Sequence, residues 1–391
     1  RRRHGHLRIT RGKARGDTQR PHGPCRAARR LRAVSLAGII SRHRAELERT
    51  HRDRLLPGHY RALDDISGCR QGQHGQIMLH CTKCARVQLQ PVSCGHRLCP
   101  TCRNHDTTLW LERQREKLLP VRYYMVTLTL PGVLRPLAWA HQRLVYGLMF
   151  DASVAAMRDL AAGRHGFGAS IAMTGVLHTH SRRRDYHPHI HFIVPGGGID
   201  TRRRTWIRRT GKWLFPGRAL SKLFRAKLRD ALRAHQLHVP EAVYAHDTVV
   251  KIIEVGTGEP ALEYLARYLY RGVIADNQIA ENPDGTVTFT YTESRTNQRR
   301  TRTLPANESL WLILQHVLPI RFQRVRHYGF LHTNAKRTLQ LVQYVLRVAA
   351  NIARPPERPK WPCPTCSAPM TFLAFVRGGQ PIVRIRGSPG Q

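Results

Sequence analysis

Acidic side chains are scarce in this chain of 391 residues. It holds 25 Asp and Glu against 65 Lys and Arg, which gives a formal net charge of +40 and a pI near 11.3. A surface so poor in carboxylates attracts polyanions, and nucleic acid is the usual one. Because most of the cations are arginines, bidentate contacts with phosphate are favoured.

Long apolar runs are also missing. No stretch approaches the roughly 18 residues of a membrane helix, and the basic start RRRHGHLRITRGKARGD lacks the apolar core of a secretory signal. We therefore expect no membrane partner. The phosphate-binding pattern GxxxxGK followed by Ser or Thr is absent too, so we expect no nucleotide cofactor. Hydrophobic residues still make up 41% of the chain, which excludes a disordered basic tail.

Cysteines are concentrated in one segment. Six of the nine lie between Cys69 and Cys102, and two CxxC pairs are among them. Such clustering with histidines is typical of zinc binding in a reducing compartment rather than of disulfides. His80 competes with His96 for one place, but an ordered set of eight ligands would fill two tetrahedral zinc sites: Cys69, His74, Cys81, Cys84, Cys94, His96, Cys99 and Cys102.

A further CxxC pair, Cys363 and Cys366, stands near the end of the chain. Nothing downstream completes a tetrahedral site there, so half of a degenerate zinc ribbon and a pair between subunits both stay open. For the cysteine segment itself, recognition of DNA and a purely structural clip are equally compatible with the pattern. Neither reading gives the zinc ions chemistry, because a closed tetrahedral site has no open position.

Apolar periodicity predicts an α+β fold. Strands are expected over 123–131, 169–180, 187–198 and 248–254, and helices over 31–66, 106–118, 137–162, 219–235, 259–271 and 336–353. The arginine-rich loop SRRRDY joins two of these strands, which predicts an antiparallel pair.

The strand segment HPHIHF carries the sharpest chemical pattern. Alternate side chains of a strand share a face, so His187, His189 and His191 point one way while Ile190 and Phe192 face the core. Two imidazoles on one face can ligate a divalent ion. A solvated histidine-rich strand end would show the same pattern, and a lone His-x-His pair is a weak signal.

The helical segment EYLARYLYR adds a pair of tyrosines. Tyr264 and Tyr268 are four residues apart and share a face, with Arg267 and Arg271 beside them. A tyrosine hydroxyl can attack a phosphodiester and hold the phosphate covalently, while a metal ion stabilises charge on the phosphate oxygens. Core packing or base stacking is the commoner role of such a pair.

Together these segments resemble the two-tyrosine HUH transposases of the insertion sequence 91 type, which have an N-terminal zinc-binding region. The resemblance covers about residues 33–370 and rests on the cysteine segment, RLLPGHYRAL, TLTLP, LHTHSRR, YHPHIHFIVPGGG, YLARY and RHYGF, in the order that the family requires. One departure is Leu98, which stands where the family often has a histidine before CPxC.

The resemblance implies a central antiparallel sheet flanked by helices, with the histidine strand in its middle beside the tyrosine helix. Carried over, His189 and His191 hold Mg²⁺ or Mn²⁺, and Tyr264 and Tyr268 are the nucleophiles that cut and rejoin single-stranded DNA of element ends and target. A cytoplasmic, nucleoid-associated bacterial protein is expected. No third metal ligand stands out among Asn277, Gln278, Glu263 and His187.

We expect four parts along the chain: a basic, flexible arm (1–30), a helical and zinc-binding region (31–105), a catalytic domain (106–335), and a C-terminal helix, Pro-rich linker and CPTC tail (336–391). The arginines expected to bind DNA are Arg182, Arg183, Arg184, Arg267 and Arg271. Charge runs are commonly just solvated faces.

Three other readings stay open. A replication initiator or relaxase shares the nicking chemistry, although the cysteines and YLARY favour the transposase. A non-catalytic zinc-dependent nucleic-acid-binding protein explains the charge and the cysteines, but leaves the histidine and tyrosine patterns as coincidence. An inactive copy of the element is the third.

Overall fold

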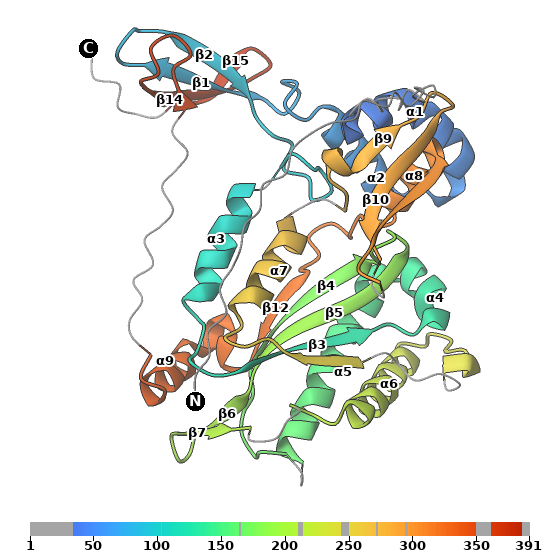
Figure 1. The fold of residues 1–391 in the computed structure, drawn as a ribbon, viewed down its shortest axis with the longest axis vertical. Coiled ribbons are helices and arrows are strands. Elements are labelled where there is room, and N and C mark those ends of the chain that lie inside the picture. Colours follow the sequence, from blue (N-terminus) through green and yellow to red (C-terminus); the bar gives the residue numbers. More distant parts are fainter. Residues whose placement is uncertain are drawn as a thin grey trace, which may run out of the picture.

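The computed structural model describes residues 34–102, 104–163, 166–209, 214–243, 250–270, 273–293, 296–348 and 361–384. The fold is α+β with antiparallel sheets, as the sequence predicted. Figure 1 shows a large lower body around the central sheet, a smaller helical body above it, and a small sheet at the top. The predicted arm, 1–30, lies outside the described residues.

The central sheet has five antiparallel strands in the order β12-β4-β5-β3-β8. Their bounds are β3 (Tyr123–Thr129), β4 (Met173–His180), β5 (Tyr186–Pro195), β8 (Val250–Glu254) and β12 (Val325–Tyr328). The histidine strand β5 is therefore the middle strand, as the family resemblance implied. Pro131 follows β3, consistent with its role as the predicted stop.

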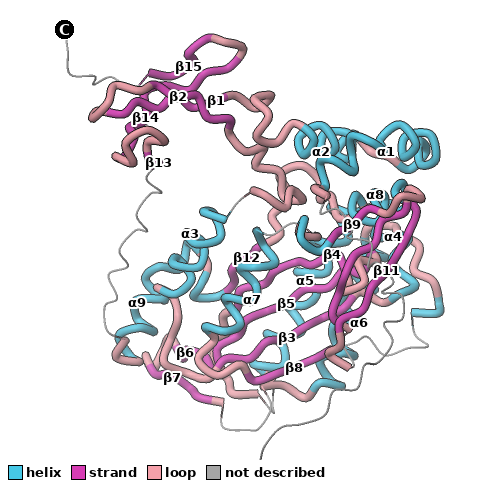
Figure 2. Tube along the Cα trace, turned by 45° about the horizontal axis from the view of Figure 1, so that its top comes forward, coloured by secondary structure: helices cyan, strands magenta, loops and turns pink. Residues whose placement is uncertain are grey.

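Helices cover both faces of this sheet (Figure 2). On one face, α5 (Gln142–Ala162) and α6 (Gly217–Ala234) bury Ile190 and Phe192 of β5 in the largest core. On the other face lie α3 (Asn104–Arg115), α7 (Glu259–Tyr270) and α9 (Lys336–Val345), which pack on Val176 and Ile193. The histidines of β5 share this second face, because side chains alternate along a strand.

Gly175 in β4 shows how tightly the first face is packed. A Cβ atom at this position would lie 2.5 Å from the Phe192 ring and 3.0 Å from the Phe150 ring. Only glycine leaves room for both aromatic rings at this point of the sheet. Phe192 in turn fixes the strand that carries the histidines.

The helical body forms a separate core from distant segments. Helices α1 (Leu36–His51), α2 (Pro57–Ser67) and α8 (Ala306–Leu314) pack with the sheet β11-β10-β9. These strands are β9 (Ile279–Glu281), β10 (Thr286–Thr292) and β11 (Arg299–Pro305). Ser35 caps α1 by accepting from the amide of Gly38, and Pro57 opens α2. Cys99 and Cys102 belong to the same core.

The cysteine segment contains strands that the sequence analysis did not expect. β1 (Gln76–Cys81) pairs with β2 (Val87–Pro91) and with β14 (Pro369–Arg377) from the C-terminal tail. β13 (Trp361–Pro362) and β15 (Gln380–Arg384) complete this sheet. The CPTC tail is thus joined to the N-terminal cysteine segment.

The remaining described elements are short: α4 (Arg135–Ala140) precedes α5, and β6 (Gly197–Asp200) pairs with β7 (Thr205–Arg208). No described helix has the length and apolar character to cross a lipid bilayer.

Candidate metal and nucleic-acid site

Three histidines converge on the second face of the central sheet. His189 and His191 come from β5, and His178 comes from the neighbouring strand β4, directly opposite His189. One ring nitrogen from each lies within 4.8 Å of the others, which is close enough for one metal ion. Among the described residues this is the histidine group able to hold a metal, and His178 is a member that the sequence analysis missed.

Alternation along β4 brings His178 to this face. Val176 packs in the core of the second face, and His178, two residues later, lies opposite His189 in the same unbroken register. The register shifts only after His178, so that His180 lies opposite Tyr186. The LHTH motif was therefore an available signal for a histidine ligand, although the sequence alone does not show that this strand pairs with the histidine strand.

Hydrogen bonds orient the β5 imidazoles. Nδ1 of His189 lies 2.7 Å from the carbonyl oxygen of His187. Because a carbonyl can only accept, Nδ1 carries the proton, and the lone pair is on Nε2. Nδ1 of His191 lies 2.8 Å from the Thr127 hydroxyl of β3, while its Nε2 is buried without a hydrogen-bond partner among the described residues. Both rings therefore can present Nε2 as a ligand atom.

Burial keeps the three rings neutral. It lowers the pKa of His189 to about 4 and, with the neighbouring His189, that of His191 to about 3. Burial, followed by the charges of its histidine neighbours, lowers the pKa of His178 well below its ordinary value. A neutral imidazole is the form that binds metal, so the donor set is ready at neutral pH.

The other candidates for a third ligand are engaged elsewhere. Nδ1 of His187 accepts from Arg135 at 2.8 Å. Glu263 pairs with Arg115 of α3 at 3.4 Å, and Gln278 accepts from Arg184 at the same distance. Neither His187 nor Glu263 belongs to the histidine group.

Helix α7 places Tyr264 beside the histidines. The Tyr264 ring lies edge-on to His191, with 5.9 Å between ring centroids. Leu265 and Ala261 bury the helix against the sheet, and Arg115 of α3 pairs with Glu259 at its first turn. Tyr268 follows one turn later, but the side chains of Arg267 and Tyr268 lie outside the description, as does the whole of Arg271.

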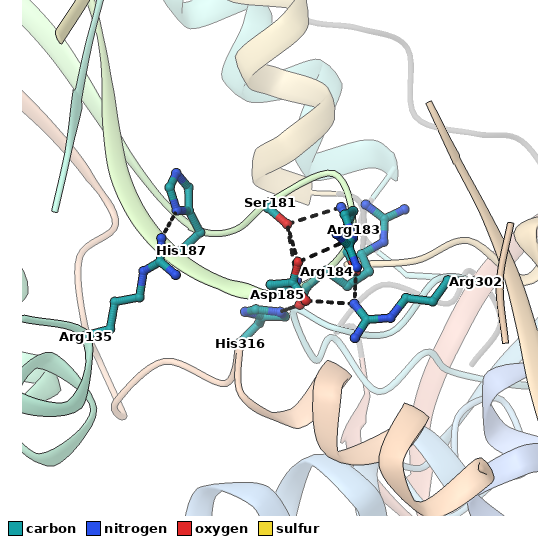
Figure 3. Close-up of polar contacts among 8 residues, drawn as sticks. All are labelled: Arg135, Ser181, Arg183, Arg184, Asp185, His187, Arg302 and His316. Carbon is teal, nitrogen blue, oxygen red and sulfur yellow. Dashed lines mark hydrogen bonds and ion pairs between the residues drawn. The ribbon is translucent and has the colours of Figure 1, made fainter. Parts of the chain in front are cut away.

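The arginine loop before β5 is held in a fixed shape (Figure 3). The guanidinium of Arg302 donates to the carbonyl of Arg183 at 2.9 Å and to the carboxylate of Asp185 at 2.7 Å. Nε2 of His316 lies 2.8 Å from the carbonyl oxygen of Arg184, a residue in the left-handed conformation with φ 69°. Arg182 and Arg184 also line a cavity of about 450 Å³ with residues of β10 and β11.

The cysteines gather into two groups of four. Cys69, Cys94, Cys99 and Cys102 form the first, and Cys81, Cys84, Cys363 and Cys366 form the second. In each group the ligand atoms lie within 4.8 Å of one another. The backbone N–H of His96 donates to Sγ of Cys94, with 3.4 Å between nitrogen and sulfur, as is usual where thiolates bind zinc. Both groups suit tetrahedral zinc.

This grouping corrects the ligand set inferred from the sequence. His74 and His96 belong to neither group. His74 donates to the carbonyl of Asp65 at 3.0 Å, and Nδ1 of His96 accepts from the amide of Leu98 at 3.2 Å. Their places are taken by Cys363 and Cys366, which the sequence left without a partner. The sequence CPTC occurs both at 99–102 and at 363–366, and this repeated motif was the signal that the C-terminal pair also suits zinc.

Two family models match the chain. The model described as "Transposase zinc-binding domain" matches residues 39–130, and the model described as "Putative transposase" matches residues 172–338. The first covers the first cysteine group and reaches β3. The second covers His178, β5 and α7.

Curated relatives match over most of their length. A protein of Sinorhizobium fredii named "Putative transposase y4qJ" is 32% identical over 329 residues, which cover 78% of this chain and 82% of the relative. A Pseudomonas savastanoi protein, "Transposase for insertion sequence element IS801", is 27% identical over 328 residues, or 75% and 78% of the two chains. No solved structure matches.

Proposed function

The chain belongs to the insertion sequence 91 family of transposases, and from this premise we propose that it nicks and rejoins single-stranded DNA at element ends through a 5′-phosphotyrosine intermediate. The observation that carries the proposal is the Tyr264 ring edge-on to the buried group of His178, His189 and His191. This arrangement supports the proposal, because a tyrosine hydroxyl next to a metal-binding histidine group could attack a phosphodiester.

In the proposed step, the Tyr264 oxygen attacks the scissile phosphorus and forms the phosphotyrosine bond. The bond from phosphorus to the 3′ oxygen breaks, the tyrosine gives up its proton, and the leaving oxygen gains one as a 3′-OH. Rejoining runs the same step backwards, so one phosphoester replaces another and no external energy source is needed. Tyr268 would repeat the attack on a second strand.

A divalent ion on the histidines would polarise the scissile phosphate. The buried Nε2 of His191, which has no partner among the described residues, fits such an ion. Three imidazoles suit Mn²⁺ better than Mg²⁺, which prefers oxygen ligands and keeps its waters. The chain's own part is to hold the rings neutral and aimed, and to position phosphates with Arg182, Arg183 and Arg184.

We further propose that each of the two cysteine groups holds one structural zinc ion. Four thiolates leave no open position, so these ions would do no chemistry. The proposed substrate is DNA of the bacterial nucleoid.

A cleavage assay tests the function. Purified protein is incubated with labelled single-stranded DNA that spans an element end, in Mn²⁺, Mg²⁺ or EDTA. The products are then run on a denaturing protein gel. We expect a label-bearing protein band that needs metal, is stronger with Mn²⁺, and disappears in the Tyr264→Phe/Tyr268→Phe double variant.

The double variant is the matched control, since it removes two hydroxyl groups only. Tight, salt-sensitive binding with no adduct on either strand and with either metal would instead identify a non-catalytic DNA-binding protein or an inactive copy. An adduct that persists in the double variant would place the nucleophile elsewhere.

A further inference from the structure

A cavity of about 300 Å³ lies where three distant segments meet. Residues 94–98 of the first cysteine group form one side, the end of β4 forms another, and residues 316–321 form a third. His178 lines this cavity as well as belonging to the histidine group. The cavity therefore borders the candidate metal site, and its size is at the lower end of small-molecule sites, which hold roughly 300–1,000 Å³.

The lining combines apolar walls with a basic rim. Leu98, Val273 and Leu318 contribute apolar surface, and Arg61 and Arg321 are exposed arginines at the cavity. Apolar surface suits a flat base, whereas the arginines suit the phosphates on either side of it.

The lining also contains a buried histidine whose ring has an unsatisfied nitrogen. His316 is 4% exposed and lines the cavity. Its Nε2 donates to the carbonyl of Arg184 at 2.8 Å (Figure 3), so in the neutral ring the lone pair is on Nδ1. Burial lowers the pKa of His316 to about 4, which keeps the ring neutral. Nδ1 is buried and has no hydrogen-bond partner among the described residues.

An unsatisfied buried acceptor calls for a donor on the ligand. Phosphate oxygens would be repelled by this lone pair, whereas every nucleobase carries at least one N–H group. We propose that the cavity binds one unstacked nucleobase of single-stranded DNA, next to the phosphate held at the histidine group. This inference rests on the proposed function, because the histidine group supplies the position of the phosphate.

Crosslinking locates the base. The probe is oligo(dT) carrying a 5-iodouracil in place of thymine, bound in EDTA so that no cleavage occurs, then irradiated and digested. We expect crosslinked peptides that contain residues 94–98 or 316–321. Crosslinks confined to other peptides, such as those of the edge strand β12, would overturn the proposal.

A binding comparison separates the base from the backbone. Affinities for oligo(dT) and for an abasic oligomer of the same length are measured in EDTA for the wild type and for His316→Phe. Losing the base contact should lower the affinity for oligo(dT) by about tenfold while leaving the affinity for the abasic oligomer unchanged. Equal losses on both oligomers would show that His316 merely supports the Arg184 loop, and no loss on either would also reject the site.

The matched control is His51→Phe. His51 is another buried histidine, 4% exposed and packed on Trp311, but it does not line the cavity. It should leave the ratio of the two affinities unchanged. If His316→Phe does not fold, Arg321→Ala at the exposed rim of the cavity replaces it. This variant should bind both oligomers more weakly, because the arginine is expected to contact the DNA backbone. Unchanged binding of both oligomers would contradict that backbone contact. Because all binding is measured without metal, this proposal can fail while the phosphotyrosine adduct still forms, and the reverse.

Discussion

At the scale of single residues, the candidate metal site depends on which nitrogen of each ring carries the proton. The carbonyl of His187 settles this for His189, since it can only accept. The Thr127 hydroxyl can donate or accept, so His191 presents Nε2 to a metal ion only if its Nδ1 donates to Thr127. Thr127 thus acts through His191, as a positioning residue.

We predict that Thr127→Val weakens metal binding by about tenfold or more, because ring orientation and tautomer are lost while side-chain volume is kept. The affinity for Mn²⁺ is measured by isothermal titration calorimetry on the folded protein. The control is Thr174→Val: this threonine makes the same contact, at 2.9 Å, with His327 on β12, away from the histidine group. Equal affinity in the wild type and Thr127→Val would remove Thr127 from the site.

At the scale of elements, periodicity was sufficient for the middle of the central sheet. The alternation in YHPHIHFIVP correctly predicted which residues of β5 reach the core and which share the histidine face. The spacing of α7 likewise predicted that Tyr264 lies on a helix, although nothing local sets that helix beside His191. These features are local, and the 2-residue and 3.6-residue periods report them directly.

Features that depend on non-local pairing could not be predicted in this way. The antiparallel pairing of β4 with β5 sets His178 opposite His189 and so adds His178 to the site. The pairing of β1 with β14 joins segments that lie 291 residues apart at His80 and Thr371, and it turns two half-sites into a group of four cysteines. A single sequence shows each CxxC pair, but not which pair faces which.

The second cysteine group should hold its own zinc ion. We predict two zinc ions per wild-type chain and one in Cys363→Ser/Cys366→Ser, because two remaining thiolates cannot complete a tetrahedral site. Zinc content is measured by atomic emission on the purified protein. Cys81→Ser/Cys84→Ser should lose the same single ion.

The quadruple variant makes this test decisive. If the four cysteines share one ion, combining both pairs of substitutions removes no more zinc than either pair alone. Additive loss of a second ion would show that the two CxxC pairs bind metal separately, contrary to the structure.

At the scale of the whole molecule, the charge of +40 predicts strong attraction to any nucleic acid. This long-range attraction does not show which residues contact the bound strand. Local phosphate contacts can be identified by experiment, because each contact releases condensed counterions and adds to the salt dependence of binding. The arginine loop before β5 is the place to look, since its backbone is held by Arg302 and His316 close to the histidine strand.

We therefore predict that Arg183→Ala reduces the slope of log affinity against log salt by about 0.7, the value for one phosphate of a single strand. The Arg183 side chain is 62% exposed and its Nε lies 3.8 Å from the Asp185 carboxylate, so it can turn to a phosphate at little cost. Binding of oligo(dT) is followed by fluorescence anisotropy in EDTA between about 50 and 200 mM salt. Arg218→Ala is the control, because this exposed arginine stands at the start of α6, which packs on the opposite face of the sheet. If the salt-dependence slopes of the wild type and Arg183→Ala are equal, Arg183 makes no phosphate contact with the strand. The bound DNA would then have to contact other arginines.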